Sequence, residues 1–565
     1  MRSTKNSSSV LARRMYSSVS LVVLTMGIAA AEAAPNCSNL VLLTLPNTTL
    51  SSAQPYVAGQ TLAEGVTAPV DLCRVVGKAT PTPASNINFE VWLPNSNWSG
   101  RYEQIGNGGL AGAVPMSIMS FGAGKNNVVA GTDDGSSQPP GQPAGLFGQS
   151  RDRLEDYESR AVHMTNVNAK ALIQAFYGKG PKYSYFAGCS KGGGESHFSA
   201  QRHPDDFDGI LGGAATNNST GLITGWALNI QAVQLNNPGF VPAANVAGTL
   251  IPAMNQQCKH AKAVATDRFL TYPDKCHIDF SKLVCSGAPN SSCLTYPQIN
   301  GLRAVLAGPR TSFGRQIAPG YEPDFAGWVG TIINDAQTPP ATPTTSQAFL
   351  DTAVFTYWLR PPATLASFSL DTDWQRFVND LGKIVDAVDP DLRKFKARGG
   401  KMIQYAGLAD PQVTPKLAID YYNSVVDFNR KSKDDRGENG DHDRNDRTDQ
   451  SSNPLAETQE FYRLYLVPGM GHCFGGEGPN YFGAFDGGLP EGNPSNDIFA
   501  ALERWVEKAV PPQAIVASGM NNAFSPSVPF TRPLCPYPQA AVYTGGDTNN
   551  AANFACRPDS DSHHH

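Results

Sequence analysis

The chain has little net charge and no long hydrophobic run beyond its N-terminal region. Its formal net charge is only −5 over 565 residues, so it lacks both the basic surface that binds nucleic acid and a field that would steer anionic substrates. No later segment is apolar over the roughly 20 residues that a membrane-spanning helix needs. CxxC pairs are also missing, which argues against a zinc site. We therefore expect no nucleic-acid partner and no membrane partner.

The N-terminal residues have the pattern of a secretory signal peptide. Basic residues at positions 2, 5, 13 and 14 precede an apolar stretch at 19–31, and small residues at 31–34 offer a cleavage site. The apolar stretch is too short for a transmembrane anchor. We predict a signal peptide over residues 1–34 and a secreted or periplasmic protein. The even number of cysteines, ten in all, then favours disulfides.

A serine lies in a glycine-rich turn near the middle of the N-terminal half. A β-prone run at 183–187 leads into Gly-Cys-Ser-Lys-Gly at 188–192, and a helical pattern follows at 195–202. Strand, tight turn and helix form the layout of a nucleophile elbow, in which small residues must lie two before and two after the serine. Gly188 and Gly192 meet that need around Ser190. The alternative is a glycine-rich turn with an incidental serine, and this stretch alone favours it.

Strands and helices alternate before and after this turn, which predicts an α/β sheet. The segments that carry this alternation are strands at 88–93, 101–105, 127–131, 207–213, 401–406 and 463–467, and helices at 157–177, 415–426 and 496–508. The alternation breaks between 217 and 390, where proline, asparagine, threonine, aromatic residues and four cysteines accumulate. We interpret 217–390 as an inserted lid domain between two parts of one core, 35–216 and 391–565. A charged stretch at 430–453 is interpreted as a flexible surface insertion.

Ser190, Asp410 and His472 each follow a predicted strand, in the chain order serine, acid, histidine that α/β-hydrolases use. In such a triad the serine attacks a carbonyl, the histidine takes and returns its proton, and the acid orients the histidine. Cys189 precedes Ser190 and Cys473 follows His472. A hydrogen bond between Ser190 and His472 would bring the two cysteines near the roughly 4.4–6.8 Å Cα separation of a disulfide. The alternatives are an exposed loop histidine and a turn aspartate, and the paired cysteines argue against both.

The oxyanion of such a reaction needs backbone N–H donors. One would be the N–H of Lys191, directly after the nucleophile. The other would come from Gly-Asn-Gly-Gly at 106–109, which follows an early strand and lets the backbone approach closely. A purely structural turn remains the alternative for this loop.

Five motifs resemble the tannase and feruloyl esterase family, which includes mono(2-hydroxyethyl) terephthalate hydrolase. They are Gly-Cys-Ser-Lys-Gly-Gly at 188–193, Arg-Gly-Gly-Lys-Met-Ile at 398–403, Gly-Leu-Ala-Asp at 407–410, Phe-Tyr-Arg-Leu-Tyr-Leu-Val-Pro-Gly-Met-Gly-His-Cys at 461–473, and Thr-Arg-Pro-Leu-Cys-Pro-Tyr at 531–537. The resemblance implies an α/β-hydrolase core with a large lid, the triad Ser190, Asp410 and His472, and oxyanion donors at Gly109 and Lys191. It also implies five disulfides: Cys37–Cys73, Cys189–Cys473, Cys258–Cys276, Cys285–Cys293 and Cys535–Cys556.

One lid loop departs from the family pattern. The resemblance implies an aspartate-rich loop after the first lid cysteine, and in many family members this loop binds Ca²⁺. In this chain, Lys259, Lys262 and Thr266 stand where the carboxylates of that loop would be. Calcium takes several, mostly anionic, oxygen ligands. We therefore expect no lid calcium and no other cofactor, with Lys262 as a candidate built-in cation. Aspartates at 267, 274 and 279 leave a shifted site open.

The resemblance implies esters of aromatic acids, such as ferulate, gallate or terephthalate, as small-molecule substrates. Aromatic residues of the lid could line an acyl pocket or pack in the lid core: Phe325, Trp328, Phe355, Tyr357 and Trp358. Arg360 is the nearest candidate for the arginine that grips the free carboxylate in the terephthalate enzyme, and its match is poor. We predict a secreted serine esterase that prefers feruloyl or related hydroxycinnamoyl esters, with tannase and terephthalate monoesterase as alternatives. A catalytically silent binding protein and a peptidase are the alternatives of other classes.

Overall fold

The computed structural model describes residues 36–63, 65–235, 237–438, 453–484, 492–519 and 530–558. The predicted signal peptide lies outside these residues, as does most of the predicted insertion at 430–453. Within the described ranges, none of the helices combines the length and the apolar character needed to cross a membrane.

A nine-stranded sheet forms the centre of the core, in the order β1-β4-β5-β7-β6-β8-β9-β10-β11. Its strands are β1 (Thr48–Tyr56), β4 (Leu72–Ala79), β5 (Ile87–Pro94), β6 (Arg101–Ile105), β7 (Val128–Thr132), β8 (Tyr183–Cys189), β9 (Gly209–Gly213), β10 (Lys401–Gly407) and β11 (Tyr462–Val467). The pairs from β1 to β7 are antiparallel, and those from β7 through β6 to β11 are parallel. Parallel strands end at one common edge, where α/β sheets carry their sites.

Helices cover both faces of this sheet. Successive side chains of a strand point to opposite faces, and on β8 Tyr185 and Phe186 accordingly join different hydrophobic clusters. The Phe186 cluster includes residues of α3 (Ala161–Tyr177) and α12 (Pro415–Glu438), and the Tyr185 cluster includes residues of α14 (Ile498–Lys508). Because both faces are covered, the central strands are buried along almost their whole length.

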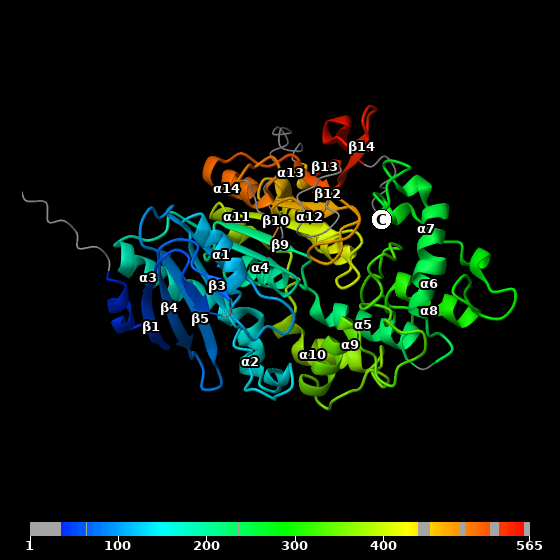
Figure 1. Cartoon of the computed structure of the whole chain (residues 1–565), viewed down its shortest axis with the longest axis horizontal. Helices are drawn as coiled ribbons and strands as arrows, with labels where there is room; N and C mark the ends of the chain where they lie inside the picture. Colours follow the sequence, from blue (N-terminus) through cyan, green and yellow to red (C-terminus); the bar gives the residue numbers. More distant parts are fainter. Residues whose placement is uncertain are drawn as a thin grey trace, which may run out of the picture.

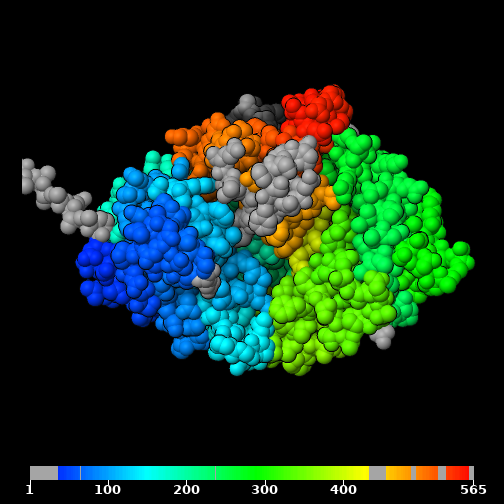
Figure 2. Space-filling view, in the orientation of Figure 1, coloured from blue at the N-terminus to red at the C-terminus, as the bar shows by residue number. Residues whose placement is uncertain are grey.

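The chain leaves the sheet after β9 and returns at β10, and the segment between them forms the lid. Its helices are α5 (Ser219–Val233), α6 (Ala243–Asn245), α7 (Ile251–Gln257), α8 (Tyr296–Ala307), α9 (Ser346–Tyr357) and α10 (Asp373–Val385). The lid lies beside the core (Figure 1), and the two form one continuous surface in the space-filling view (Figure 2). A separate hydrophobic cluster fills the lid and extends into Phe147 and Tyr157 of the core. The fold is an α/β-hydrolase core with a large inserted lid.

Two helices differ from the sequence-based prediction. The helix predicted from residue 157 begins earlier, because α2 (Arg151–Glu155), the π-helical turn η3 (Asp156–Arg160) and α3 follow one another without a break. The helix predicted to end near 426 continues to Glu438. Charged side chains such as lysine and arginine favour helix as strongly as most apolar ones, so a change to a solvated composition does not end a helix.

The structure contains the five disulfides that the resemblance implies. Two pairs, Cys258–Cys276 and Cys285–Cys293, close short loops in the lid. Cys37–Cys73 joins the N-terminal turn to β4, and Cys535–Cys556 joins two parts of the C-terminal tail. Cys189–Cys473 joins the end of β8 to the loop after β11, and the two cysteines are 284 residues apart in the sequence. Such cross-linking is typical of oxidising compartments.

Candidate active site

Ser190 lies at a tight turn between β8 and α4 (Lys191–Arg202), with a φ of 62° and a ψ of −117°. A non-glycine residue rarely adopts a positive φ, and such strain is common at functional sites. The turn is crowded: a Cβ added at Gly188 would lie 2.7 Å from the backbone of Gly192. The two glycines around the serine are therefore required by the close approach of backbone to backbone, as the sequence predicts.

His472 lies between Ser190 and Asp410. Its Nε2 is 2.9 Å from Ser190 Oγ, and its Nδ1 is 2.8 Å from Asp410 Oδ2. The other carboxylate oxygen of Asp410 accepts hydrogen bonds from the backbone N–H groups of Gln412 and Val413, at 2.8 and 2.9 Å. The Asp410 side chain is only 1% exposed, whereas that of His472 is 25% exposed. The histidine is thus held by a fixed buried acid and remains open to a substrate.

The Cys189–Cys473 disulfide cross-links the two loops that carry this hydrogen bond. Its Cα atoms are 6.0 Å apart. Cys189 and Ser190 are neighbours, as are His472 and Cys473, so the disulfide limits how far the histidine can move from the serine. Both cysteines are buried.

The two residues predicted to donate backbone N–H groups to an oxyanion, Gly109 and Lys191, lie in the wall of the cavity beside Ser190. Lys191 is the first residue of α4, so its N–H has no intrahelical acceptor. Several hydrogen bonds hold the 106–109 loop. Among them, Tyr157 Oη donates to the Gly109 carbonyl at 2.6 Å, the Gly192 N–H donates to the Asn107 carbonyl at 2.7 Å, and the Asn107 N–H donates to Glu195 Oε2 at 3.2 Å.

A cluster of buried charges lies directly behind the nucleophile. Lys191 Nζ is 3.1 Å from Glu195 Oε1 and 3.6 Å from Glu158 Oε2, and it lies 4.4 Å from the centre of the Tyr157 ring. Burial alone would lower the pKa of Lys191, but the carboxylates of Glu195, Glu158 and Asp134 outweigh it and raise that pKa. Burial and the charge of Glu195 raise the pKa of Asp134 well above its usual value. Lys191 and Glu195 thus form a buried ion pair, with the raised pKa of Asp134 beside it.

Glu158 lines the cavity together with Lys191 and Tyr157. Its side chain is 4% exposed, and burial raises its pKa to about 7, against the charge of Lys191, which lowers it. Within the described ranges, no residue makes a hydrogen bond with its carboxyl group. The carboxyl group of Glu158 can therefore accept a hydrogen bond from a molecule in the cavity.

The cavity beside Ser190 is mainly apolar. It has an empty volume of about 530 Å³, which includes space open to solvent at its mouth. Its apolar wall comes from the lid and from the loop after Asp410: Leu222, Ile223, Trp226, Leu350, Val354, Trp358 and Val413. Its polar wall comes from Glu158, Lys191, Thr216, Ser219 and Gln412.

Of the five aromatic residues considered for this pocket, Trp358 lines it and the other four do not. Phe325 packs on Trp328, with ring centres 4.8 Å apart, and Phe355 stacks on Phe368 at 4.3 Å. Tyr357 packs at the edge of the same lid cluster. Arg360 is exposed and lies outside the cavity wall, where it donates to the Leu359 carbonyl at 2.9 Å.

In the lid loop after Cys258, where the family's calcium-binding carboxylates are replaced, the ammonium group of Lys262 is held by oxygen atoms of the protein. Lys262 Nζ donates to the Asp267 carbonyl at 2.6 Å and to Asn255 Oδ1 at 2.9 Å. Burial raises the pKa of nearby Asp324 to about 6, and the charge of Lys262 acts against that rise. The Asp267 carboxylate pairs with Arg532 at 2.7 Å. Asp274 and Asp279 are exposed, and within the described residues these three aspartates do not converge on one point. The residues here therefore do not fit a calcium ion.

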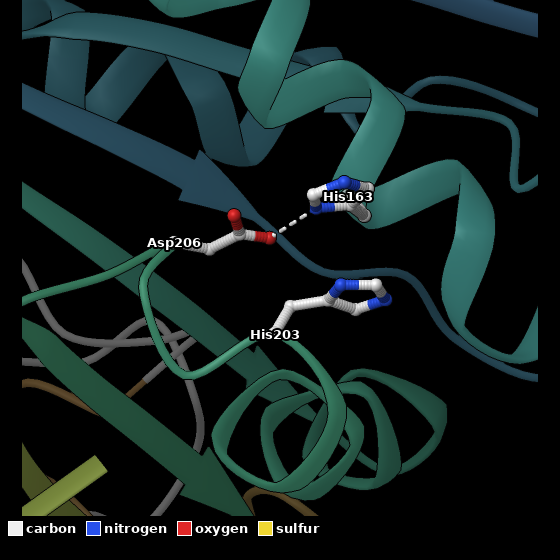
Figure 3. Close-up of side chains that lie close together, drawn as sticks. All are labelled: His163, His203 and Asp206. Atoms are coloured by element: carbon white, nitrogen blue, oxygen red, sulfur yellow. Dashed lines mark hydrogen bonds and ion pairs between the residues drawn. The ribbon is translucent and has the colours of Figure 1, made fainter. Parts of the chain in front are cut away.

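His163, His203 and Asp206 form the one group of metal-ligand type among the residues that the structure describes (Figure 3). It lies where α4 ends, at the opposite edge of the sheet from Ser190. His163 Nδ1 is 2.8 Å from Asp206 Oδ2, and the two imidazole rings stack 4.0 Å apart at 11°. Burial lowers the pKa of His203 to about 4. A metal binds in the plane of an imidazole ring, and parallel stacked rings do not share a plane. The arrangement is therefore a His–Asp hydrogen bond with a neutral imidazole stacked on it.

The sequence-based analysis missed Asp134, Tyr157, Glu158 and Glu195. Glu195 lies four residues after Lys191, the helical spacing at which opposite charges pair. Asp134 follows a strand at the edge that carries the site. Glu158 and Tyr157 had weaker signals, because their inward direction depends on the π-helical turn.

Comparisons with known proteins agree with this geometry. The family described as "Tannase and feruloyl esterase" matches residues 73–557. An uncharacterized esterase from Xanthomonas campestris pv. campestris is 36% identical over 547 residues, with 93% of this chain and 92% of that protein covered. Feruloyl esterase B from Aspergillus niger is 29% identical, covering 91% of this chain and 93% of that protein. The crystal structure of feruloyl esterase B from Aspergillus oryzae superimposes with a TM-score of 0.79 at 26% identity, covering 92% of this chain and 99% of that one.

Proposed function

The chain belongs to the tannase and feruloyl esterase family and is a carboxylic ester hydrolase, and we propose that it cleaves esters of aromatic acids through an acyl-enzyme on Ser190. The observation that carries this proposal is the position of His472, with one ring nitrogen 2.9 Å from Ser190 Oγ and the other 2.8 Å from Asp410. Those distances suit proton transfer from the serine and orientation by the acid.

In the proposed first step, Ser190 Oγ attacks the ester carbonyl while His472 Nε2 takes the hydroxyl proton. The negative oxygen of the tetrahedral intermediate would accept hydrogen bonds from the N–H groups of Gly109 and Lys191. The carbon–oxygen bond to the alcohol then breaks, and His472 returns the proton to the leaving alcohol. Asp410 stabilises the imidazolium in between.

In the second step a water molecule takes the place of the alcohol. His472 accepts a proton from the water while the water oxygen attacks the acyl carbon. The bond between that carbon and Ser190 Oγ then breaks, His472 returns the proton to Ser190 Oγ, and the aromatic acid leaves. The same oxyanion donors serve both steps. The largely apolar cavity with Trp226 and Trp358 in its wall suits a flat aromatic acyl group.

Feruloyl or related hydroxycinnamoyl esters are proposed as the preferred substrates, and galloyl esters come second. The relatives named feruloyl esterase B support this order. The terephthalate monoester is less favoured, because Arg360 lies outside the cavity wall and a free carboxylate would find Glu158 there instead.

We also propose that the enzyme needs no calcium. The ammonium of Lys262 donates to oxygen atoms at 2.6 and 2.9 Å, so a cation already occupies the position, and a divalent ion beside it would be repelled. The five disulfides and the N-terminal pattern at 1–34 support a proposed secreted or periplasmic location.

Turnover of a substrate panel tests the proposed function. We expect wild-type protein to hydrolyse methyl ferulate and methyl gallate, and Ser190→Ala to lower kcat by several orders of magnitude without changing Tm. Asp380→Asn, a surface carboxylate of the lid helix α10, is the control and should keep full activity. An inactive wild type would support the binding-protein alternative. Equal cleavage of an anilide of the same acid would support the peptidase alternative.

A further inference from the structure

We propose that Glu158 determines the acyl specificity of this esterase by accepting a hydrogen bond from a hydroxyl group on the aromatic ring of the substrate. The inference rests on the proposed function, since it concerns the cavity beside Ser190. It assigns one residue to the preference for ring-hydroxylated aromatic acids and to the rejection of acids with a second, free carboxylate.

The first argument is that Glu158 lines the cavity with a side chain that is 4% exposed. Lys191 Nζ lies 3.6 Å from its carboxyl group, and Glu195, Asp386 and Arg202 also act on its charge. No hydrogen bond joins its carboxyl group to any residue in the part of the chain that the structure describes. A carboxylate in a cavity wall can accept a hydrogen bond from a molecule in the cavity, and a hydrogen bond to a charged group is among the stronger ones. A hydroxyl donor in the cavity would therefore bind there.

The second argument is that the lysine next to Glu158 is already committed. Lys191 Nζ lies closer to Glu195, at 3.1 Å. Glu195 in turn holds the N–H of Asn107 in the oxyanion loop. Three carboxyl groups, those of Glu195, Glu158 and Asp134, face this single ammonium, and Glu158 is the one that lines the cavity. The cavity wall therefore favours a hydrogen-bond donor and repels an anion.

The third argument is that the local fold holds Glu158 in place. The π-helical turn η3 buries four successive side chains, Asp156 to Ser159. Such turns interrupt helices most often at functional sites. Tyr157, from the same turn, donates to the Gly109 carbonyl at 2.6 Å. The turn therefore fixes the oxyanion loop and the carboxylate in one rigid element, which sets the position of the carboxylate relative to the scissile carbonyl.

A matched ester series tests the inference. We would measure kcat/KM at pH 8 for methyl cinnamate, its 3-hydroxy and 4-hydroxy derivatives, and methyl gallate beside methyl benzoate. Wild type should prefer at least one hydroxylated ester to its parent by roughly 10-fold to 100-fold, the value of a hydrogen bond to a charged group. Glu158→Leu should remove this preference, read within the variant as the ratio of kcat/KM for each hydroxylated ester to kcat/KM for methyl cinnamate, whatever its absolute rate.

A second pair of substrates tests the charge of Glu158. Wild type should hydrolyse dimethyl terephthalate at least 10-fold faster than its monomethyl ester, whose free carboxylate meets Glu158. Glu158→Gln keeps the size of the side chain and removes its charge, so the difference should shrink. Glu155→Gln, on the same helical stretch but with a side chain 47% exposed, is the control and should behave as wild type.

The outcomes separate the two proposals. A wild type that hydrolyses none of these esters would contradict the proposed function. A wild type that hydrolyses methyl cinnamate and all hydroxylated esters equally well would leave that function intact and overturn the role of Glu158, whether or not the variants fold. A hydroxyl preference that survives in Glu158→Leu would overturn it as well.

Discussion

Removal of the Cys189–Cys473 disulfide should cost both stability and activity, because this disulfide closes the longest loop of the chain and holds the histidine to the serine. The perturbation is the double variant Cys189→Ala, Cys473→Ala. In the chain-entropy relation, a loop of 284 residues contributes about 5.6 kcal/mol at 25 °C, slightly above the roughly 2–5 kcal/mol of measured effects. The matched control is Cys285→Ala, Cys293→Ala, for which a separation of 8 residues gives about 2.5 kcal/mol by the same relation.

The assay combines denaturant unfolding with the kinetics of an aryl ester. The free energy of unfolding should fall by about 3 kcal/mol more in the Cys189/Cys473 variant than in the control. Its kcat should fall by about 10-fold to 100-fold, because a misplacement of His472 by about 1 Å costs that much, while the control keeps its kcat. Full activity in the folded Cys189/Cys473 variant would refute the view that this disulfide positions the histidine.

Three further predictions follow from single contacts. Tyr157→Phe removes the 2.6 Å hydrogen bond to the Gly109 carbonyl and should lower kcat by about 10-fold with little change in KM; an unchanged kcat would contradict the role of this loop. EDTA should leave Tm and activity unchanged, whereas Lys262→Met should lower Tm; a loss in EDTA that Ca²⁺ restores would contradict the built-in cation. Burial raises the pKa of Glu158 from 4.5 to about 7. Between these two pH values the folded state keeps a proton on Glu158 that the unfolded state has lost. The free energy of unfolding of the wild type should therefore fall relative to that of Glu158→Gln as pH rises from 4.5 to 7. Lys191, Glu195, Asp386 and Arg202 face this group in both proteins, so their contributions largely cancel; a difference that does not change with pH would contradict the shift.

Much of the fold and the triad geometry could be predicted from the sequence, because both depend on local signals. Gly188 and Gly192 indicate the tight turn, and strands before Asp410 and His472 indicate a common sheet edge. The cysteines beside Ser190 and His472 indicate which distant loops meet. Each of these features is visible within a few residues.

The pocket could not be predicted in the same way, because its wall depends on how the lid packs. The sequence shows only that Trp358 is one of several aromatic residues of the lid. It does not distinguish Trp358 from Phe325, Trp328 and Phe355, which fill the lid core. Glu158 reaches the cavity only because a π-helical turn changes the direction of four side chains, and no periodicity in the sequence indicates that turn. The length of α12 was missed because charged residues form helix as readily as apolar ones.

The central claim is that Ser190 is the nucleophile, and covalent labelling tests it most directly. The protein is treated with an aryl phosphonate that reacts with activated serines, digested, and examined by mass spectrometry, with Ser190→Ala as the control. The account predicts one phosphonate on the peptide that holds Ser190, loss of esterase activity in proportion to labelling, and no label in the control. An active enzyme without label on Ser190, or equal labelling of Ser190→Ala, would contradict it.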